Sequence, residues 1–206
     1  MYIPSSFREE NPEKLYDFIE EYSFGVLFSQ HQKEAEATHL PFMVDRDNNR
    51  LYAHFSRANK HWECITDNEP VLVVFHGPHT YISPDWYEQK DTVPTWNYAA
   101  VHVKAKPVII HEKERLRSMV DQLTHHHEEM VDSEWDYEAA HPKRDRLLKA
   151  IVGIQLEILE MEGTFKFNQN RSQEDQKGVI EALSSSKREA DQAVAEVMKN
   201  TFEDEV

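Results

Sequence analysis

The chain has 206 residues, of which 30% are charged and 39% are hydrophobic, as is usual for a soluble globular protein. Its formal net charge of -15 opposes direct binding to the phosphates of DNA. No segment reaches the roughly 20 apolar residues that cross a bilayer, and the first residues lack the pattern of an export signal. Cys64 is the single cysteine, so no disulfide can form within the chain, and we predict a cytoplasmic protein.

The first half of the sequence predicts one helix followed by short strands. Asn11-Pro12-Glu13 is typical of a helix start, and a stripe of apolar residues follows it. Apolar runs and alternating patterns then predict strands at residues 24–29, 38–44, 51–55, 70–75 and 80–83. The second and third strands should form a hairpin across an Asp- and Asn-rich turn, and Gly77-Pro78 should turn the chain between the last two.

The second half predicts a long strand at residues 98–110 and then a change to helical periodicity from His111. Residues 144–151 are expected to be helical, and a further strand should extend to about Phe167. Ser172 and Ser186 each begin a capping pattern, which predicts two C-terminal helices. Six or seven strands in meander order, with inserted helices, predict a closed or partly closed antiparallel barrel.

The segment from Ser56 to Lys60 combines a hydroxyl, a guanidinium, an amide and an ammonium group directly after a predicted strand. Ser56 is suited to cap a short helix running to about Ile65, and the first amides of a helix carry positive partial charge. Together with Arg57 and Lys60, these groups predict a local site for an anion such as a phosphate. Taken alone, the same residues fit an ordinary solvated helix start, and that alternative stays open.

Aromatic and histidine residues offer weaker signals. Trp96 and Tyr98 fall on one face of a predicted strand with Asn97 between them, which suits either a flat conjugated ligand or a core or dimer contact. His39 and His54 lie on neighbouring predicted strands and could face one pocket. The run of histidines at 125–127 matches no zinc signature, because consecutive helical residues point in different directions. We therefore predict no metal site.

Several motifs occur in a fixed order: Met1-Tyr2-Ile3-Pro4, Phe7-Arg8, Ala37-Thr38-His39-Leu40-Pro41-Phe42, His54-Phe55-Ser56-Arg57-Ala58-Asn59, Gly77-Pro78-His79-Thr80-Tyr81-Ile82-Ser83-Pro84, Val93-Pro94-Thr95-Trp96-Asn97-Tyr98, and Lys166 with Gln169-Asn170-Arg171. Together they closely resemble the PaiB family of FMN-binding negative transcriptional regulators. The resemblance covers nearly the whole chain. It implies an α+β fold, the antiparallel FMN-binding split barrel, with inserted and C-terminal helices.

The resemblance further implies a homodimer with FMN at the subunit interface. Residues 1–170 would form the FMN-binding split-barrel domain, and residues 171–206 a helical extension that packs on the barrel or on the partner. The phosphate of FMN would lie at Ser56, Arg57, Asn59 and Lys60. One subunit would also line the flavin with Thr38, His39, Leu40 and His54, and its partner would contribute Trp96, Asn97, Tyr98, Lys166, Gln169 and Asn170. Asn168 stands where we expect a serine in the family.

The resemblance implies a role in repressing degradative protease production and sporulation in Bacillus-type bacteria. We favour a dimeric FMN-binding regulator that acts through a protein partner or a flavin-linked metabolite, and we assign no catalytic residue. One alternative is a flavin or haem oxidoreductase with an indirect regulatory effect. The other is a direct DNA-binding repressor, which the net charge and the lack of a helix-turn-helix pattern disfavour. No membrane association is expected.

Overall fold

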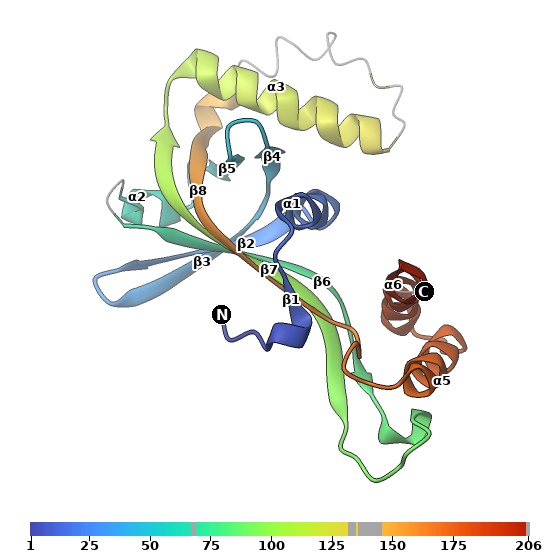
Figure 1. Cartoon of the computed structure of the whole chain (residues 1–206). Coiled ribbons are helices and arrows are strands. Elements are labelled where there is room, and N and C mark those ends of the chain that lie inside the picture. The colour runs from blue at the N-terminus through green and yellow to red at the C-terminus, as the bar shows by residue number, and fades with distance from the viewer. Residues whose placement is uncertain (67–68, 132–134, 136–145, 205–206) are drawn as a thin grey trace. The chain divides into compact units, whose positions relative to one another are not determined.

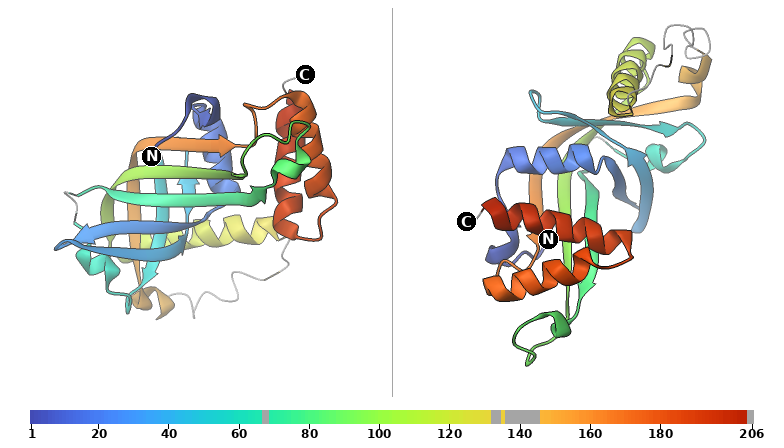
Figure 2. Two further views of the ribbon diagram at one scale, coloured as in Figure 1. Left: turned by 90° about the horizontal axis from the view of Figure 1, so that it is seen from below. Right: turned by 90° about the vertical axis from the view of Figure 1, so that its right-hand side faces the viewer.

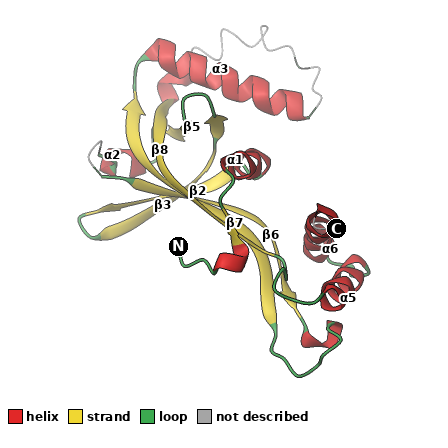
Figure 3. Cartoon of the chain, in the orientation of Figure 1, coloured by secondary structure: helices red, strands yellow, loops and turns green. Residues whose placement is uncertain are grey.

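The computed structural model describes residues 1–66, 69–131, 135 and 146–204 of the chain. Strands predominate in it (Figure 3), and they follow the order β3-β2-β6-β7-β8-β5-β4, with β1 paired to β8 (Figure 1). The strands are β1 (Arg8–Glu9), β2 (Phe24–His31), β3 (Glu34–Pro41), β4 (Met43–Asp45), β5 (Arg50–Ser56), β6 (Val71–Ile82), β7 (Thr95–Ile110) and β8 (Ile151–Lys166).

The helices are α1 (Pro12–Glu21), α2 (His61–Cys64), α3 (Lys113–Met130), α5 (Gln173–Ser184) and α6 (Glu189–Asp204). Short 3₁₀ helices are η1 (Ser5–Phe7), η2 (Pro84–Trp86) and η4 (Leu148–Ala150). None of the described helices combines the length and the apolar character that a membrane crossing requires. The chain divides into two compact units: unit 1 holds residues 1–15, 76–101 and 162–206, and unit 2 holds residues 16–75 and 102–161.

Unit 2 contains an antiparallel sheet that begins to close on itself. β2 pairs with β3 and β6, while β5 pairs with β4 and β8. β3 also contacts β5, although the two strands lie near opposite ends of the strand order. Alternate residues of β5, namely Leu51, Ala53 and Phe55, are fully buried, as expected for a strand with one face in the core. The predicted α+β fold with a partly closed antiparallel barrel is therefore confirmed.

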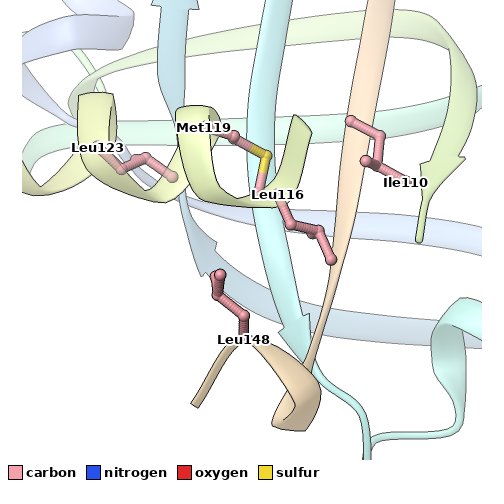
Figure 4. Packing of buried hydrophobic residues seen from close by; sticks show 5 residues of the cluster. All are labelled: Ile110, Leu116, Met119, Leu123 and Leu148. Atoms are coloured by element: carbon pink, nitrogen blue, oxygen red, sulfur yellow. The ribbon is translucent and has the colours of Figure 1, made fainter. Parts of the chain in front are cut away.

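A separate apolar cluster attaches α3 to the sheet within unit 2. Leu116, Met119 and Leu123 of α3 pack with Ile110 at the end of β7 and with Leu148 of η4 (Figure 4). Gly153 of β8 allows this close approach, because a Cβ at that position would lie only 2.8 Å from Leu116 Cδ2. The helical period that the sequence shows after His111 thus places its apolar face on the sheet.

In unit 1, the C-terminal helices α5 and α6 lie side by side (Figure 2). Ser172 caps α5 by accepting the N–H of Asp175, as predicted. Asp191 near the start of α6 is buried and accepts hydrogen bonds from Thr80 of β6, at 2.5 Å, and from Ser186, at 2.6 Å. These bonds satisfy the buried carboxylate and attach α6 to β6 within the unit. The predicted boundary at residue 170 stays a prediction.

The first helix and several strands confirm the sequence interpretation, with Asn11 Oδ1 accepting the N–H of Glu13 at the start of α1. The predicted turn at Gly77-Pro78 is wrong, because β6 continues through both residues. Among the described residues no glycine has a positive φ, so Gly77 does not use the conformation that would make it a turn residue. Pro78 fits the strand because its fixed φ is compatible with extended backbone.

Two other strand predictions also change. β3 forms its hairpin with β2, whereas the hairpin partner of β5 is the short β4. The β2–β3 turn is made by Gln32 and Lys33, with φ of 51° and 71°, and lacks the Asn-Gly signal typical of such turns. The predicted helix at 144–151 extends too far, because Ile151 already belongs to β8. Residues 144–145 of that prediction lie outside the described residues.

Substitution of Gly178 tests the packing of α5. A Cβ at Gly178 would collide with the backbone carbonyl oxygen of Trp86 in η2. We expect Gly178→Ala to lower the free energy of unfolding by about 1–3 kcal/mol, because overpacking outweighs the helix-favouring effect of alanine. Glu181→Ala, on the exposed side of the same helix, is the control and should change stability little. Urea unfolding followed by circular dichroism measures both, and a Gly178→Ala protein as stable as wild type would contradict this packing.

Candidate functional site

The turn after β5 differs from the predicted helix start. Asn59 N–H donates to the carbonyl of Ser56 at 2.9 Å, which forms a turn, and α2 begins only at His61. The prediction that Ser56 caps this helix is therefore wrong. Asn59 takes that role in part, because its Oδ1 accepts the N–H of His61 at 3.0 Å. The first N–H of α2 therefore bonds to the side chain of Asn59, two residues before the helix, and not to that of Ser56 at the end of β5.

A chain of hydrogen bonds connects this turn to two strands of unit 2. Asn59 Nδ2 donates to Thr38 Oγ1 at 3.2 Å, and Thr38 Oγ1 lies 2.8 Å from His61 Nδ1. His61 Nε2 lies 2.8 Å from Ser29 Oγ. Because Thr38 accepts from Asn59, its own hydroxyl can donate to a neutral Nδ1, and the Nε2–H of the same imidazole can donate to Ser29. In this tautomer both ring nitrogens of His61 are hydrogen-bonded.

His61 is the residue at the centre of this arrangement that sequence reasoning missed. Its side chain is only 4% exposed, and its ring packs edge-on against Phe55. Burial lowers the pKa of His61, although the nearby carboxylate of Glu36 acts in the opposite direction. His61 directly follows the segment from Ser56 to Lys60, but nothing in a single sequence indicates that this histidine is buried.

Arg57 turns away from the anion site that the sequence predicted. Its Nε donates to the carbonyl of Lys149 at 2.9 Å, and its Nη2 donates to the carbonyl of Ile151 at 2.7 Å. Its backbone N–H also donates to the carbonyl of Ala150 at 2.7 Å. The guanidinium thus attaches the turn to the start of β8.

Ser56 and Lys60 present polar groups at the surface of the same turn. Lys60 Nζ lies 2.7 Å from Glu63 Oε1, and both side chains are largely exposed. Ser56 is exposed, and its Oγ lies 3.4 Å from the N–H of Ala58. Such an exposed ion pair contributes little to stability, so the ammonium of Lys60 can exchange Glu63 for a phosphate.

The three predicted residues of β3 point in two directions. Thr38 and Leu40 share one face, where Thr38 joins the hydrogen-bond chain and Leu40 is 6% exposed in the core. His39 points to the other face and stacks at 6.1 Å on Phe24, which is 65% exposed. His39 therefore lies on the opposite face of β3 from Thr38, which is bonded to the turn at Ser56–Lys60.

His54 is one of two predicted site residues with an unsatisfied buried polar atom, the other being Asn97, whose Oδ1 has no hydrogen-bond partner among the described residues. His54 Nδ1 is buried and likewise has no hydrogen-bond partner among the described residues. Burial also lowers the pKa of His54, so the neutral imidazole is favoured. Buried polar atoms are usually paired, so this nitrogen is suited to a ligand contact.

Six of the predicted residues belong to unit 1. On β7, Trp96 is 51% exposed, and its ring lies 6.2 Å from that of Tyr81 and 6.3 Å from that of His79. Tyr98 is half-buried, and alternation along the strand puts it on the same face as Trp96. Asn97 points the other way, is fully buried and donates to Met198 Sδ at 3.4 Å, so its side chain faces α6.

The residues after β8 make contacts within unit 1. Lys166 Nζ bonds to Thr95 Oγ1, and burial lowers the pKa of Lys166. The Gln169 side chain folds back, accepting the N–H of Phe167 at 2.7 Å and donating to the carbonyl of Phe165 at 2.5 Å. Asn170 is exposed at the end of this turn.

Asn168, where a serine was expected, has a structural reason to be an amide. Its backbone has a φ of 67°, and asparagine tolerates this left-handed region better than most residues. Its side chain is 2% exposed, and its Nδ2 donates to the hydroxyl of Tyr87 at 3.2 Å. The substitution therefore stabilises the turn that follows β8.

Comparison with known proteins identifies the family. A model described as "Putative FMN-binding domain" matches residues 1–160. The protease synthase and sporulation protein PAI 2 of Bacillus subtilis (strain 168) is 34% identical over 209 aligned residues, which cover 100% of both chains. The chain belongs to the PaiB family. As a member of this family it is an FMN-binding protein, as the resemblance implied.

Solved structures of low sequence identity share the fold. The flavocytochrome Anf3 from Azotobacter vinelandii aligns with a TM-score of 0.59 at 10% identity, over 78% of this chain and 69% of that one. The FAD and heme binding protein from Mycobacterium smegmatis also gives a TM-score of 0.59, at 12% identity, over 77% and 73% of the two chains. These likenesses show the split-barrel fold and nothing finer.

The buried position of His61 predicts a pH dependence of stability. Since its pKa in the folded protein lies below the ordinary value of 6.5, the unfolded chain binds the proton more readily. The contribution of neutral His61 to the free energy of unfolding should therefore be fully present above pH 6.5 and should decrease as the pH falls below that value. His54 and His127, whose pKa values are also lowered, act in the same direction.

We expect His61→Gln to lower the free energy of unfolding at pH 7.5 by about 1–3 kcal/mol, through loss of its hydrogen bonds. The variant should also lose less stability than wild type between pH 7.5 and pH 5.5. Thermal unfolding at both pH values measures the difference, and His31→Gln in β2 is the control for the exchange itself. An identical loss on acidification in wild type and His61→Gln would show that His61 does not carry this dependence.

Proposed function

We propose that this protein is a cytoplasmic, homodimeric regulator that binds FMN and acts through a protein partner or a flavin-linked metabolite. The match of the FMN-binding family model to residues 1–160 carries the proposal, because it spans the turn at Ser56–Lys60 and the strands attached to it. The Bacillus subtilis relative, which aligns over the whole of both chains, is named for protease synthesis and sporulation. We extend to this chain a role of the same kind.

The described residues of unit 2 fit the phosphate end of FMN. Lys60 offers an ammonium group and Ser56 a hydroxyl group, both exposed on the turn. Asn59, Thr38 and His61 hold that turn in place through their hydrogen bonds. The Arg57 guanidinium also fixes the turn by donating hydrogen bonds to the carbonyls of Lys149 and Ile151, so we assign Arg57 a positioning role.

The ring system of FMN would be met by other predicted residues. His54 of unit 2 offers its unpaired Nδ1, and the partner subunit would contribute the aromatic side chains of Trp96 and Tyr98, as the family resemblance implies. Bound FMN supplies one- and two-electron redox chemistry, which would let a regulator respond to the redox state of the cell. Gln169 is already committed to contacts within unit 1, so we give it a structural role. Asn97 donates to Met198 Sδ, but its buried Oδ1 has no partner among the described residues.

A dimer would cover apolar side chains that each unit exposes. Phe24 and Phe28 are 65% and 38% exposed on β2, and Trp96 and Tyr81 are 51% and 41% exposed on neighbouring strands of unit 1. Exposed aromatic residues of this kind are enriched at protein interfaces. Sedimentation equilibrium at micromolar concentration tests the dimer, and a stable monomer would exclude it.

The proposed phosphate site predicts that FMN and riboflavin bind with different affinities. We expect FMN to bind more tightly than riboflavin, and Lys60→Met to weaken FMN binding about tenfold, because a charge-assisted contact to the phosphate is lost. Riboflavin lacks that phosphate, so its affinity should stay unchanged in the variant. Titration of flavin fluorescence measures all four dissociation constants.

Lys106→Met provides the matched control, since Lys106 is an exposed lysine elsewhere in unit 2. It should leave both affinities as in wild type. Equal FMN affinity in wild type and Lys60→Met, or an equal loss for riboflavin, would contradict the placement of the phosphate at this turn.

Direct recognition of DNA is not expected. A dimer would carry a formal charge of -30, twice the -15 of each chain, and would be repelled by the duplex. At about 150 mM salt we expect no sequence-specific binding to the promoter of a repressed gene. Fluorescence anisotropy with labelled promoter DNA, and a scrambled duplex as control, measures this. Nanomolar affinity for the promoter alone would overturn the indirect mechanism.

A further inference from the structure

A cationic pocket of about 380 Å³ lies in unit 2, apart from the exposed groups of the phosphate turn. It is formed where the start of α3, the segment η4 and the side chain of Arg57 meet. Its lining residues are Arg57, His111, Lys113, Leu116, Leu148 and Lys149. Ser56 and Lys60, which we assign to the flavin phosphate, do not line it, whereas Arg57, which supports their turn, does.

The floor of this pocket is apolar and firmly held. Leu116 and Leu148 are 2% and 6% exposed and belong to the cluster that attaches α3 to the sheet (Figure 4). A ligand with a small apolar body could therefore contact these two side chains while its charged end meets the basic groups above them. Pockets that bind small molecules combine apolar walls and a few polar groups in this way.

Two of the basic groups are held in position by the protein. The Arg57 guanidinium donates to the carbonyls of Lys149 and Ile151, which use only two of its five N–H donors. The His111 ring lies against the edge of Trp62, at 5.5 Å between ring centroids, and Trp62 Nε1 donates to the carbonyl of Arg57 at 3.3 Å. An anion would meet a guanidinium that needs little further ordering, which lowers the entropic cost of binding.

The charge of the pocket contrasts with that of the chain. Arg57, Lys113 and Lys149 contribute three positive charges, and none of the described lining residues is acidic, in a protein of formal net charge -15. The adjacent carboxylate of Glu112 is engaged elsewhere, since it accepts the N–H groups of Glu114 and Arg115 at the start of α3. The local field therefore favours an anion although the whole chain repels one.

We infer that this pocket binds a small phosphate monoester with an apolar substituent, at a site separate from that of FMN. The phosphate would accept hydrogen bonds from Arg57 and Lys149, and the substituent would lie on Leu116 and Leu148. Planar guanidinium groups and ammonium groups are the usual partners of phosphate in proteins. Such a ligand would give the protein an input independent of its flavin.

Phenyl phosphate is a suitable probe, measured by isothermal titration calorimetry on FMN-saturated protein. Saturation keeps the flavin phosphate site filled, so any phenyl phosphate that binds must occupy another site. We expect one molecule to bind per chain, more tightly than inorganic phosphate, which cannot contact the apolar floor. Benzyl alcohol, which has the ring without the charge, should not bind. Inorganic phosphate binding as tightly as phenyl phosphate would overturn the assignment of the leucine floor.

Lys149→Glu reverses one charge of the pocket and should weaken phenyl phosphate binding by about tenfold or more. Lys149 is exposed, so the variant should fold normally, and its melting temperature checks this. Lys33→Glu, in the exposed β2–β3 turn, changes the net charge equally and should leave the affinity almost unchanged. Equal losses in the two variants would attribute binding to net charge alone and overturn the pocket.

The flavin and pocket hypotheses fail separately. If FMN saturation abolishes phenyl phosphate binding, the two phosphates share one site and the inference is wrong. If FMN itself does not bind, the same titrations on flavin-free protein still decide the pocket, through the difference between Lys149→Glu and Lys33→Glu. Absence of phenyl phosphate binding to wild type under both conditions would exclude the site.

Discussion

The hydrogen-bond chain from Asn59 through Thr38 and His61 to Ser29 is the interaction on which the candidate site depends. It connects a surface turn to β2 and β3 and contains a buried imidazole that would be costly to leave unpaired. Because these hydrogen bonds join the turn to both strands, the turn has a defined position relative to β2 and β3. The exposed Lys60 therefore lies on a turn that buried neighbours hold in place.

The two charged side chains of this turn also have different surroundings. The chain is strongly acidic, yet its turn after β5 sends Lys60 to the surface and Arg57 toward the start of β8. Two cationic regions therefore arise from one short segment. β5, the strand that precedes this turn, is held on β8 by a regular antiparallel ladder.

Local patterns succeeded where the chemistry is local. Asn11 and Ser172 cap helices as their sequences indicate, because a capping side chain bonds to amides two or three residues away. The apolar period after His111 predicted the face of α3 that packs on the sheet. The family motifs predicted the split barrel and FMN binding, since they lie on the strands and turns that build the fold.

The sequence by itself determined the fold class, the family, the acidic character and most helices and strands, because these follow from periodicity, capping and extended motifs. Only the tertiary structure decided that Gly77-Pro78 continues a strand, that Arg57 faces β8, that Asn97 is buried and that His61 links the turn after β5 to the sheet. Each of these depends on partners far away in the chain. A single sequence specifies a side chain's chemistry, whereas the packing of distant segments decides which groups that chemistry meets.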